Sequence, residues 1–146
     1  MWKTLRALLG DLRQAPITGL RLEVAGLALM LEIARADHNS SPDERKAIAR
    51  AATQVFGVEG ALAEELIAEA ETAVEEAVSL FDFTRLLNER LDQEMKLRLL
   101  EHLWRVAYVD GHLDHFEEYF LRKICDLLHL SHRDLIRAKL AVVPGG

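Results

Sequence analysis

The chain has 146 residues, the length of one ordinary domain, with half of its residues hydrophobic and 29% charged. This composition excludes a disordered tail, and a lone cysteine excludes an internal disulfide. The net charge of −6 argues against nucleic acid as the main partner, because phosphate binding needs a concentrated basic surface. No uncharged run approaches the roughly 20 residues of a membrane-spanning helix, and no secretion signal follows Met1. We therefore expect a cytoplasmic protein with one domain, residues 1–146.

Helical periodicity runs through the chain without any alternating, strand-like run, which predicts an all-helical fold. Residues 1–19 are expected to form an N-terminal helix, over 2–13, and a linker. Ser41-Pro42-Asp43-Glu44 combines an N-cap, a proline at the first helical position and a glutamate at the third. Asp92, Asp114 and Ser131 are expected to start later helices. In chain order, the helices after the first are expected over 20–36, 41–57, 61–78, 83–90 and 92–109, then from 114 and from 131.

The most informative feature is an internal repeat at an offset of 73 residues. Ile33–His38 aligns with Val106–Gly111, and the helix start at 41–44 aligns with 114–117. The apolar frame repeats at the same offset, pairing Ile48, Ala51, Val55 and Leu62 with Leu121, Ile124, Leu128 and Leu135. Two helix–loop–helix units, repeat one at about 20–66 and repeat two at about 93–140, are expected to pack with pseudo-twofold symmetry. The predicted architecture is a compact all-α bundle of about seven or eight helices.

Four acidic residues of the repeat continue apolar stripes instead of polar faces. Asp37 and Asp110 each end such a stripe, and Glu44 and Glu117 each begin one. A carboxylate that points toward the core costs several kcal/mol unless hydrogen bonds, a cationic side chain or a metal compensate. Because oxygen ligands suit hard divalent ions, these four acids are candidate ligands for Ca²⁺, Mg²⁺ or Mn²⁺, in one shared site or one per repeat.

A purely architectural interpretation of the same acids stays open. The two glutamates could complete capping boxes, and the two aspartates could form Asx-turns. Nearby guanidinium groups could also neutralise the acids; these belong to Arg35, Arg45, Arg105 and Arg122. His38, His112 and His115 lie beside the motifs, as ligands of a mixed Mn²⁺ or Zn²⁺ site or as exposed residues. The acid spacing does not match an EF-hand loop.

No other pattern points to catalysis, and we expect no enzyme. The sequence has no His-Glu-x-x-His motif, no paired cysteines and no glycine-rich phosphate loop. Cys125 is expected to be a packing residue, because no base for a nucleophile can be placed beside it. The segment Glu59–Glu76 contains seven glutamates and no basic residue, which predicts a solvent-facing helix surface. Core or interface aromatic side chains are expected at Trp104, Tyr108, Phe116 and Phe120.

The two motifs resemble those of the tellurite-resistance TerB family. They read Ala-Asp-x-x-x-Ser-x-x-Glu, ending at Glu44, and Val-Asp-Gly-x-x-Asp-x-x-Glu, ending at Glu117, and the resemblance covers roughly 20–140. It implies an all-helical bundle of two pseudo-symmetric halves in the bacterial cytoplasm, with the motif acids Asp37, Glu44, Asp110 and Glu117 binding metal. His38 departs from the family pattern, which has glycine there, as at Gly111. Since glycine favours the left-handed conformation that ends a helix, the two halves are not expected to bind equally well.

The resemblance also implies a role in stress-response assemblies at the inner face of the membrane. The implied partners are proteins, among them membrane-associated tellurite-resistance or stress proteins. A structural adaptor, in which the motif acids serve only as helix caps and salt-bridge partners, is the alternative function.

Overall fold

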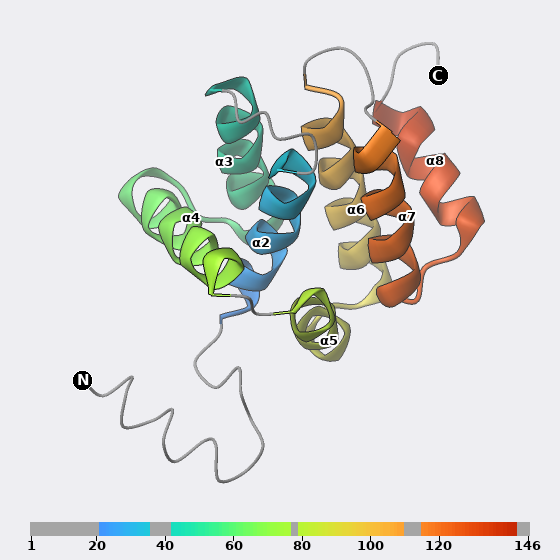
Figure 1. The fold of residues 1–146 in the computed structure, drawn as a ribbon, viewed down its shortest axis with the longest axis horizontal. Coiled ribbons are helices and arrows are strands. Elements are labelled where there is room, and N and C mark those ends of the chain that lie inside the picture. The colour runs from blue at the N-terminus through green and yellow to red at the C-terminus, as the bar shows by residue number, and fades with distance from the viewer. Residues whose placement is uncertain (1–20, 36–41, 77–78, 110–114, 143–146) are drawn as a thin grey trace, which may run out of the picture.

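The computed structural model describes residues 21–35, 42–76, 79–109 and 115–142, and the predicted helix over 2–13 lies outside them. The described part contains helices and no strand, which confirms the all-α prediction (Figure 1). The helices are α2 (Leu22–Arg35), α3 (Pro42–Phe56), α4 (Gly60–Glu75), α5 (Leu80–Arg90), α6 (Gln93–Ala107), α7 (His115–Leu127) and α8 (His132–Val142).

Short polar side chains start several helices by binding their first backbone amides. Asp92 accepts a hydrogen bond from the Met95 amide at 2.9 Å and begins α6, as predicted. Ser131 and Asp134 exchange reciprocal bonds of 3.0 Å at the start of α8, which confirms the predicted start there. The predicted start of the fifth helix at residue 83 was wrong, because Ser79 caps the helix and α5 begins at Leu80. The predicted caps Ser41 and Asp114 lie outside the described residues.

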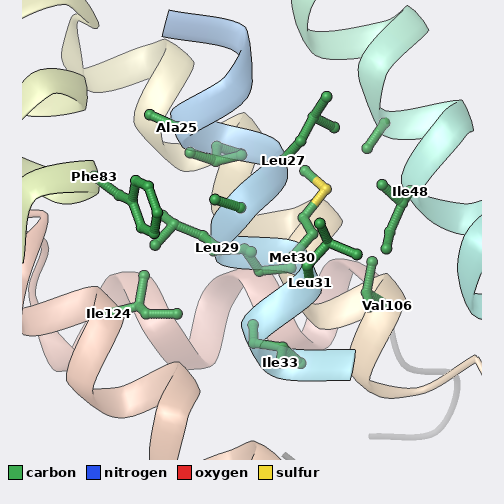
Figure 2. Packing of buried hydrophobic residues seen from close by; sticks show 14 of the residues in the cluster. Ala25, Leu27, Leu29, Met30, Leu31, Ile33, Ile48, Phe83, Val106 and Ile124 are labelled. Carbon is green, nitrogen blue, oxygen red and sulfur yellow. The ribbon is translucent and has the colours of Figure 1, made fainter. Parts of the chain in front are cut away.

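Helix α2 lies at the centre of the fold and contacts α3, α4, α5, α6 and α7. Every residue from Val24 to Leu31 is buried, so this helix has no solvent-facing side along that stretch. Figure 2 shows its side chains meeting Phe83 of α5 on one side and Ile48 of α3 on the other. A helix that is apolar on all sides needs neighbours on all sides, and the other helices supply them.

The helices before and after α5 make corresponding contacts. Helix α2 packs on α3 and α4, while α6 packs on α7 and α8. The two helix pairs also pack across one another, α3 on α6 and α2 on α7. The first residues of α3 and α7, Pro42 and His115, are 73 positions apart, as the repeat predicts. The twofold relation itself stays a prediction.

One part of the proposed alignment was wrong. Leu62 and Leu135 were paired at the offset of 73, but Leu62 is 45% exposed, whereas Leu135 is buried. The buried side chains of α4 and α8 correspond at an offset of 72 instead, with Ala63 matching Leu135. Helix α4 begins 18 residues after the start of α3, whereas α8 begins 17 residues after the start of α7, so the last helix of each half is shifted by one residue relative to the repeat.

Gly26 of α2 allows Phe56, at the end of α3, to approach closely. A Cβ atom at this position would lie 2.6 Å from Cζ and 2.9 Å from Cε2 of the Phe56 ring. Those distances are well inside van der Waals contact, so a larger residue forces the ring to move.

We therefore expect Gly26→Ala to lower the free energy of unfolding by about 1–2 kcal/mol, because the clash outweighs the better helix propensity of alanine. Urea unfolding of the purified protein measures the change. In a Phe56→Leu background the two clashing ring atoms are gone, so the same substitution should cost less or stabilise. An equal loss in both backgrounds would contradict this packing account.

Candidate functional site

Two of the four motif acids lie in the described residues, and both are buried. Glu44 is 5% exposed and Glu117 is 1% exposed. Each is the third residue of its helix, α3 or α7. The prediction that these glutamates point toward the core is therefore confirmed, whereas Asp37 and Asp110 lie outside the described residues.

The sequence of each helix explains why its glutamate is buried. In α3, Glu44 begins a stripe that continues through buried Ile48 and Val55. In α7, Glu117 begins a stripe that continues through buried Leu121 and Ile124. Steps of three and four residues keep these side chains on one face, so packing the apolar residues also buries the carboxylate.

Local interactions favour both carboxylates. The first turn of a helix carries unpaired backbone N–H groups and the positive end of the helix dipole, which stabilise an anion by about 0.3–1 kcal/mol. Glu44 and Glu117 also each have an interaction partner. The geometry is therefore compatible with the capping interpretation as well as with a bound cation.

The two helix junctions lie at the same end of the bundle. In Figure 1, the C-terminal ends of α2 and α6 and the first turns of α3 and α7 are all at the top. The packing of α3 on α6 and of α2 on α7 ties the two junctions to one apolar core. The structure thus places Glu44 and Glu117 at one end of one bundle.

Glu44 lines a surface hollow of about 230 Å³ between α2, α3 and α4. Arg45, one of the cations predicted to neutralise the motif acids, also lines it. The guanidinium of Arg45 donates to Glu71 of α4 at 2.8 Å and lies 3.6 Å from Glu64. These contacts raise the pKa of Arg45 above its ordinary value, the hydrogen bond to Glu71 contributing most. The glutamates of α4 thus serve in part as partners for arginines, in addition to facing solvent.

A metal at this end of the bundle would need ligands from the two interhelical segments. In the described ranges, no three His, Cys, Asp or Glu side chains come together as a metal-binding group. Two buried carboxylates fit the oxygen chemistry of a hard ion, and Asp37 and Asp110 are the acids predicted to complete it.

Comparison with known families decides the identity of the fold. The family model described as "Tellurite resistance protein TerB" matches residues 23–140, which is most of the chain. The chain belongs to the TerB family. No curated protein and no solved structure matches it. The match includes both motifs of this TerB-family domain and all seven described helices except the ends of α2 and α8.

The TerB-family bundle buries a histidine that the sequence analysis did not single out. His102 of α6 is 3% exposed, and Arg105 Nη1 lies 3.4 Å from both of its ring nitrogens. Burial, together with the positive charges of Arg105, Arg98 and Arg50, lowers the pKa of His102 to about 4. The spacing of Arg98, His102 and Arg105 by four and three residues was a signal in the sequence that could have indicated this cluster.

Cys125 is the packing residue that the sequence predicted. It is buried in α7 of the TerB-family bundle, with Sγ 3.5 Å from the Ser131 carbonyl oxygen. Burial, with smaller contributions from Asp126 and Asp134, raises its pKa to about 11. Because the thiolate is the nucleophilic form, Cys125 is poorly suited to react at neutral pH.

Two further predictions concern aromatic residues and the membrane. Trp104 is buried and donates from Nε1 to the Leu135 carbonyl at 3.0 Å, whereas Phe116 is 61% exposed and lies outside the core. Across the described segments of the chain, no helix combines the length and apolarity needed to cross a bilayer.

The lowered pKa of His102 predicts acid sensitivity of this TerB-family domain. As pH falls from about 6.5 to about 4, the unfolded chain binds a proton at His102 that the folded chain does not. The free energy of unfolding is therefore at its full value above about pH 6.5, and up to about 3 kcal/mol of it is lost as the pH falls toward 4. Urea unfolding at several pH values should show a shallower pH dependence for His102→Gln than for wild type.

The exposed His132 provides the matched control, because His132→Gln also removes one histidine. Its pH dependence should follow that of wild type. Identical curves for wild type and His102→Gln would show that the imidazole does not contribute.

Proposed function

We propose that this TerB-family chain is a non-enzymatic helical module that binds a divalent cation. The ligands in this proposal are Asp37, Glu44, Asp110 and Glu117, two from each helix junction. The observation that supports it is the burial of Glu44 and Glu117 at corresponding positions of α3 and α7. A cation at the same end of the bundle would offset the cost of burying two carboxylates near one core.

The ligand chemistry favours Ca²⁺, Mg²⁺ or Mn²⁺. Carboxylate oxygens are the preferred ligands of these hard ions, and no cysteine belongs to either motif. The protein would hold the ion through Glu44 and Glu117 from rigid first turns, while the aspartates would come from the intervening segments. A bound ion would neutralise acids in both halves of the bundle and so stabilise their packing.

Protein binding is the second part of the proposal. Phe116 and Tyr119 are each 61% exposed on α7, immediately before and after Glu117 and Glu118 in the chain. With Glu118 and Arg122 they line a hollow of about 510 Å³. Exposed aromatic side chains are enriched at protein interfaces, so we propose this part of α7 as a contact for partners in a bacterial tellurite or stress response. The expected location is the cytoplasm, including the inner face of the membrane.

The structural adaptor remains the alternative. In that case the motif acids act as caps and salt-bridge partners, for which the first-turn position of Glu44 and Glu117 is equally suited. The two functions differ in one measurable property, the response of stability to divalent ions.

We expect Ca²⁺ or Mn²⁺ to raise the melting temperature of the chelator-treated wild type, because an ion that binds only the folded chain stabilises it by mass action. The Asp37→Ala/Asp110→Ala and Glu44→Gln/Glu117→Gln variants should lose this response. Differential scanning calorimetry with and without millimolar ion measures the shift.

The matched control is Asp43→Asn/Glu118→Gln. It makes the same change in charge at neighbouring positions of the same helices, and Asp43 is exposed. This variant should keep the ion response of wild type. A wild type whose melting is indifferent to both Ca²⁺ and Mn²⁺ would rule out the cation and favour the adaptor, especially if Asp37→Ala/Asp110→Ala still lowered stability.

A further inference from the structure

A basic cluster lies where α3 packs on α6, apart from the motif acids. Arg98, His102 and Arg105 lie on one face of α6, because steps of four and three residues return to the same side of a helix. His102 is buried beneath this face, and the Arg105 guanidinium contacts its ring at 3.4 Å. Helix α6 contributes two guanidinium groups and one imidazole.

Arg50 of α3 adds a third guanidinium from across the helix interface. Arg45 lies on the flank of α3 that faces α4, since it pairs with Glu71 and Glu64 there. Five residues further on, the exposed Arg50 lies more than a third of a turn around the helix, away from the flank of Arg45. Helix α3 packs on α6, and the charge of Arg50 reaches His102.

The cluster is poorly neutralised by acidic side chains. Arg98 has one distant partner, Glu94, at 3.8 Å on its own helix. Among the described residues, no carboxylate lies within 4.0 Å of the Arg50 or Arg105 guanidinium. Within the described ranges, the three arginines of this interface thus carry about two more positive charges than their one ion pair, to Glu94, offsets.

We propose that Arg50, Arg98 and Arg105, together with His102, form a binding site for a dianionic phosphate group. Guanidinium groups present planar pairs of N–H donors that match phosphate oxygens, and the uncompensated charge matches that of a phosphate monoester. His102 acts as a further donor once the anion is bound, because a dianion favours the imidazolium form. The site shares no residue with the proposed cation site.

The pKa of the His102 imidazole would indicate whether phosphate is bound. Burial lowers the pKa of His102 most, and the charges that add to this effect come from Arg105 and Arg98 on its own helix and from Arg50 on α3. In the described part of the chain, α2, α7 and α8, which also pack on α6, contribute no charge that shifts it. A bound dianion would offset these three charges and raise the pKa of His102 part of the way from about 4 toward its ordinary value, because the effect of burial would remain.

The test is an NMR titration of the full-length protein with inorganic phosphate, against chloride at equal ionic strength. We expect saturable shifts of the His102 ring signals and a raised pKa with phosphate only. Arg50→Gln/Arg105→Gln should weaken phosphate binding by about tenfold or more, because two charge-assisted hydrogen bonds are lost. The matched control, Arg85→Gln/Arg133→Gln, removes the same charge from exposed residues on α5 and α8 and should bind as wild type does.

A second arm separates a free phosphate compound from a lipid headgroup. Phosphatidylcholine vesicles with and without phosphatidic acid are sedimented with the same proteins. Retention that needs both phosphatidic acid and the two arginines assigns the site to a headgroup, whereas phosphate titration without vesicle binding assigns it to a soluble ligand. Equal responses to phosphate and chloride, or phosphate binding that survives Arg50→Gln/Arg105→Gln, would overturn the site. Circular dichroism checks the fold, and the single Arg50→Gln variant, at an exposed position, replaces the double variant if that does not fold.

Discussion

The complete burial of α2 is the constraint on which the rest of the structure depends. Its apolar side chains point in every direction along Val24–Leu31, so each side needs a covering helix (Figure 2). Helices α3 and α4 cover one part, and α5, α6 and α7 cover the remainder. The first half of the chain therefore cannot bury its own central helix. The two halves form one cooperative core, in keeping with a single family match that spans both.

This core explains the position of the motif glutamates. The same helical stripes that cover α2 and α6 carry Glu44 and Glu117 at their N-terminal ends, so packing the stripe also buries the acid. The position of the carboxylates in helix first turns offsets part of the cost of their burial, because first turns favour anions. Stability and the proposed cation site are thus coupled, since any change in the charge of these acids acts directly on the core.

Arginines of helix α3 meet different surroundings on its two sides. On the α4 side, Arg45 pairs with Glu71 of α4, which also binds Arg21, the residue before α2, through Glu69. On the α6 side, Arg50 joins Arg98 and Arg105 around a buried, neutral imidazole. The formal net charge of the chain therefore does not predict the local charge on either side of α3, because local fields depend on which side chains the packing brings together.

The sequence by itself determined the features that depend on near neighbours in the chain. Capping residues such as Asp92 and Ser131 start helices through bonds that span three residues, and the steps of three and four residues correctly predicted the burial of Glu44 and Glu117. The motif spacing was also sufficient to identify the family. The missed cap at Ser79 was equally local, and its signal was present in the sequence.

Only the tertiary structure decided the features that depend on helix packing. It showed Leu62 to be exposed although its proposed counterpart Leu135 is buried, because α8 begins one residue sooner after the start of α7 than α4 does after the start of α3. It paired Arg45 with α4, and it buried His102 beneath arginines from two helices. Periodicity specifies which face of a helix is apolar, but the helix that covers this face and the charges that it carries are set by contacts between segments far apart in the chain.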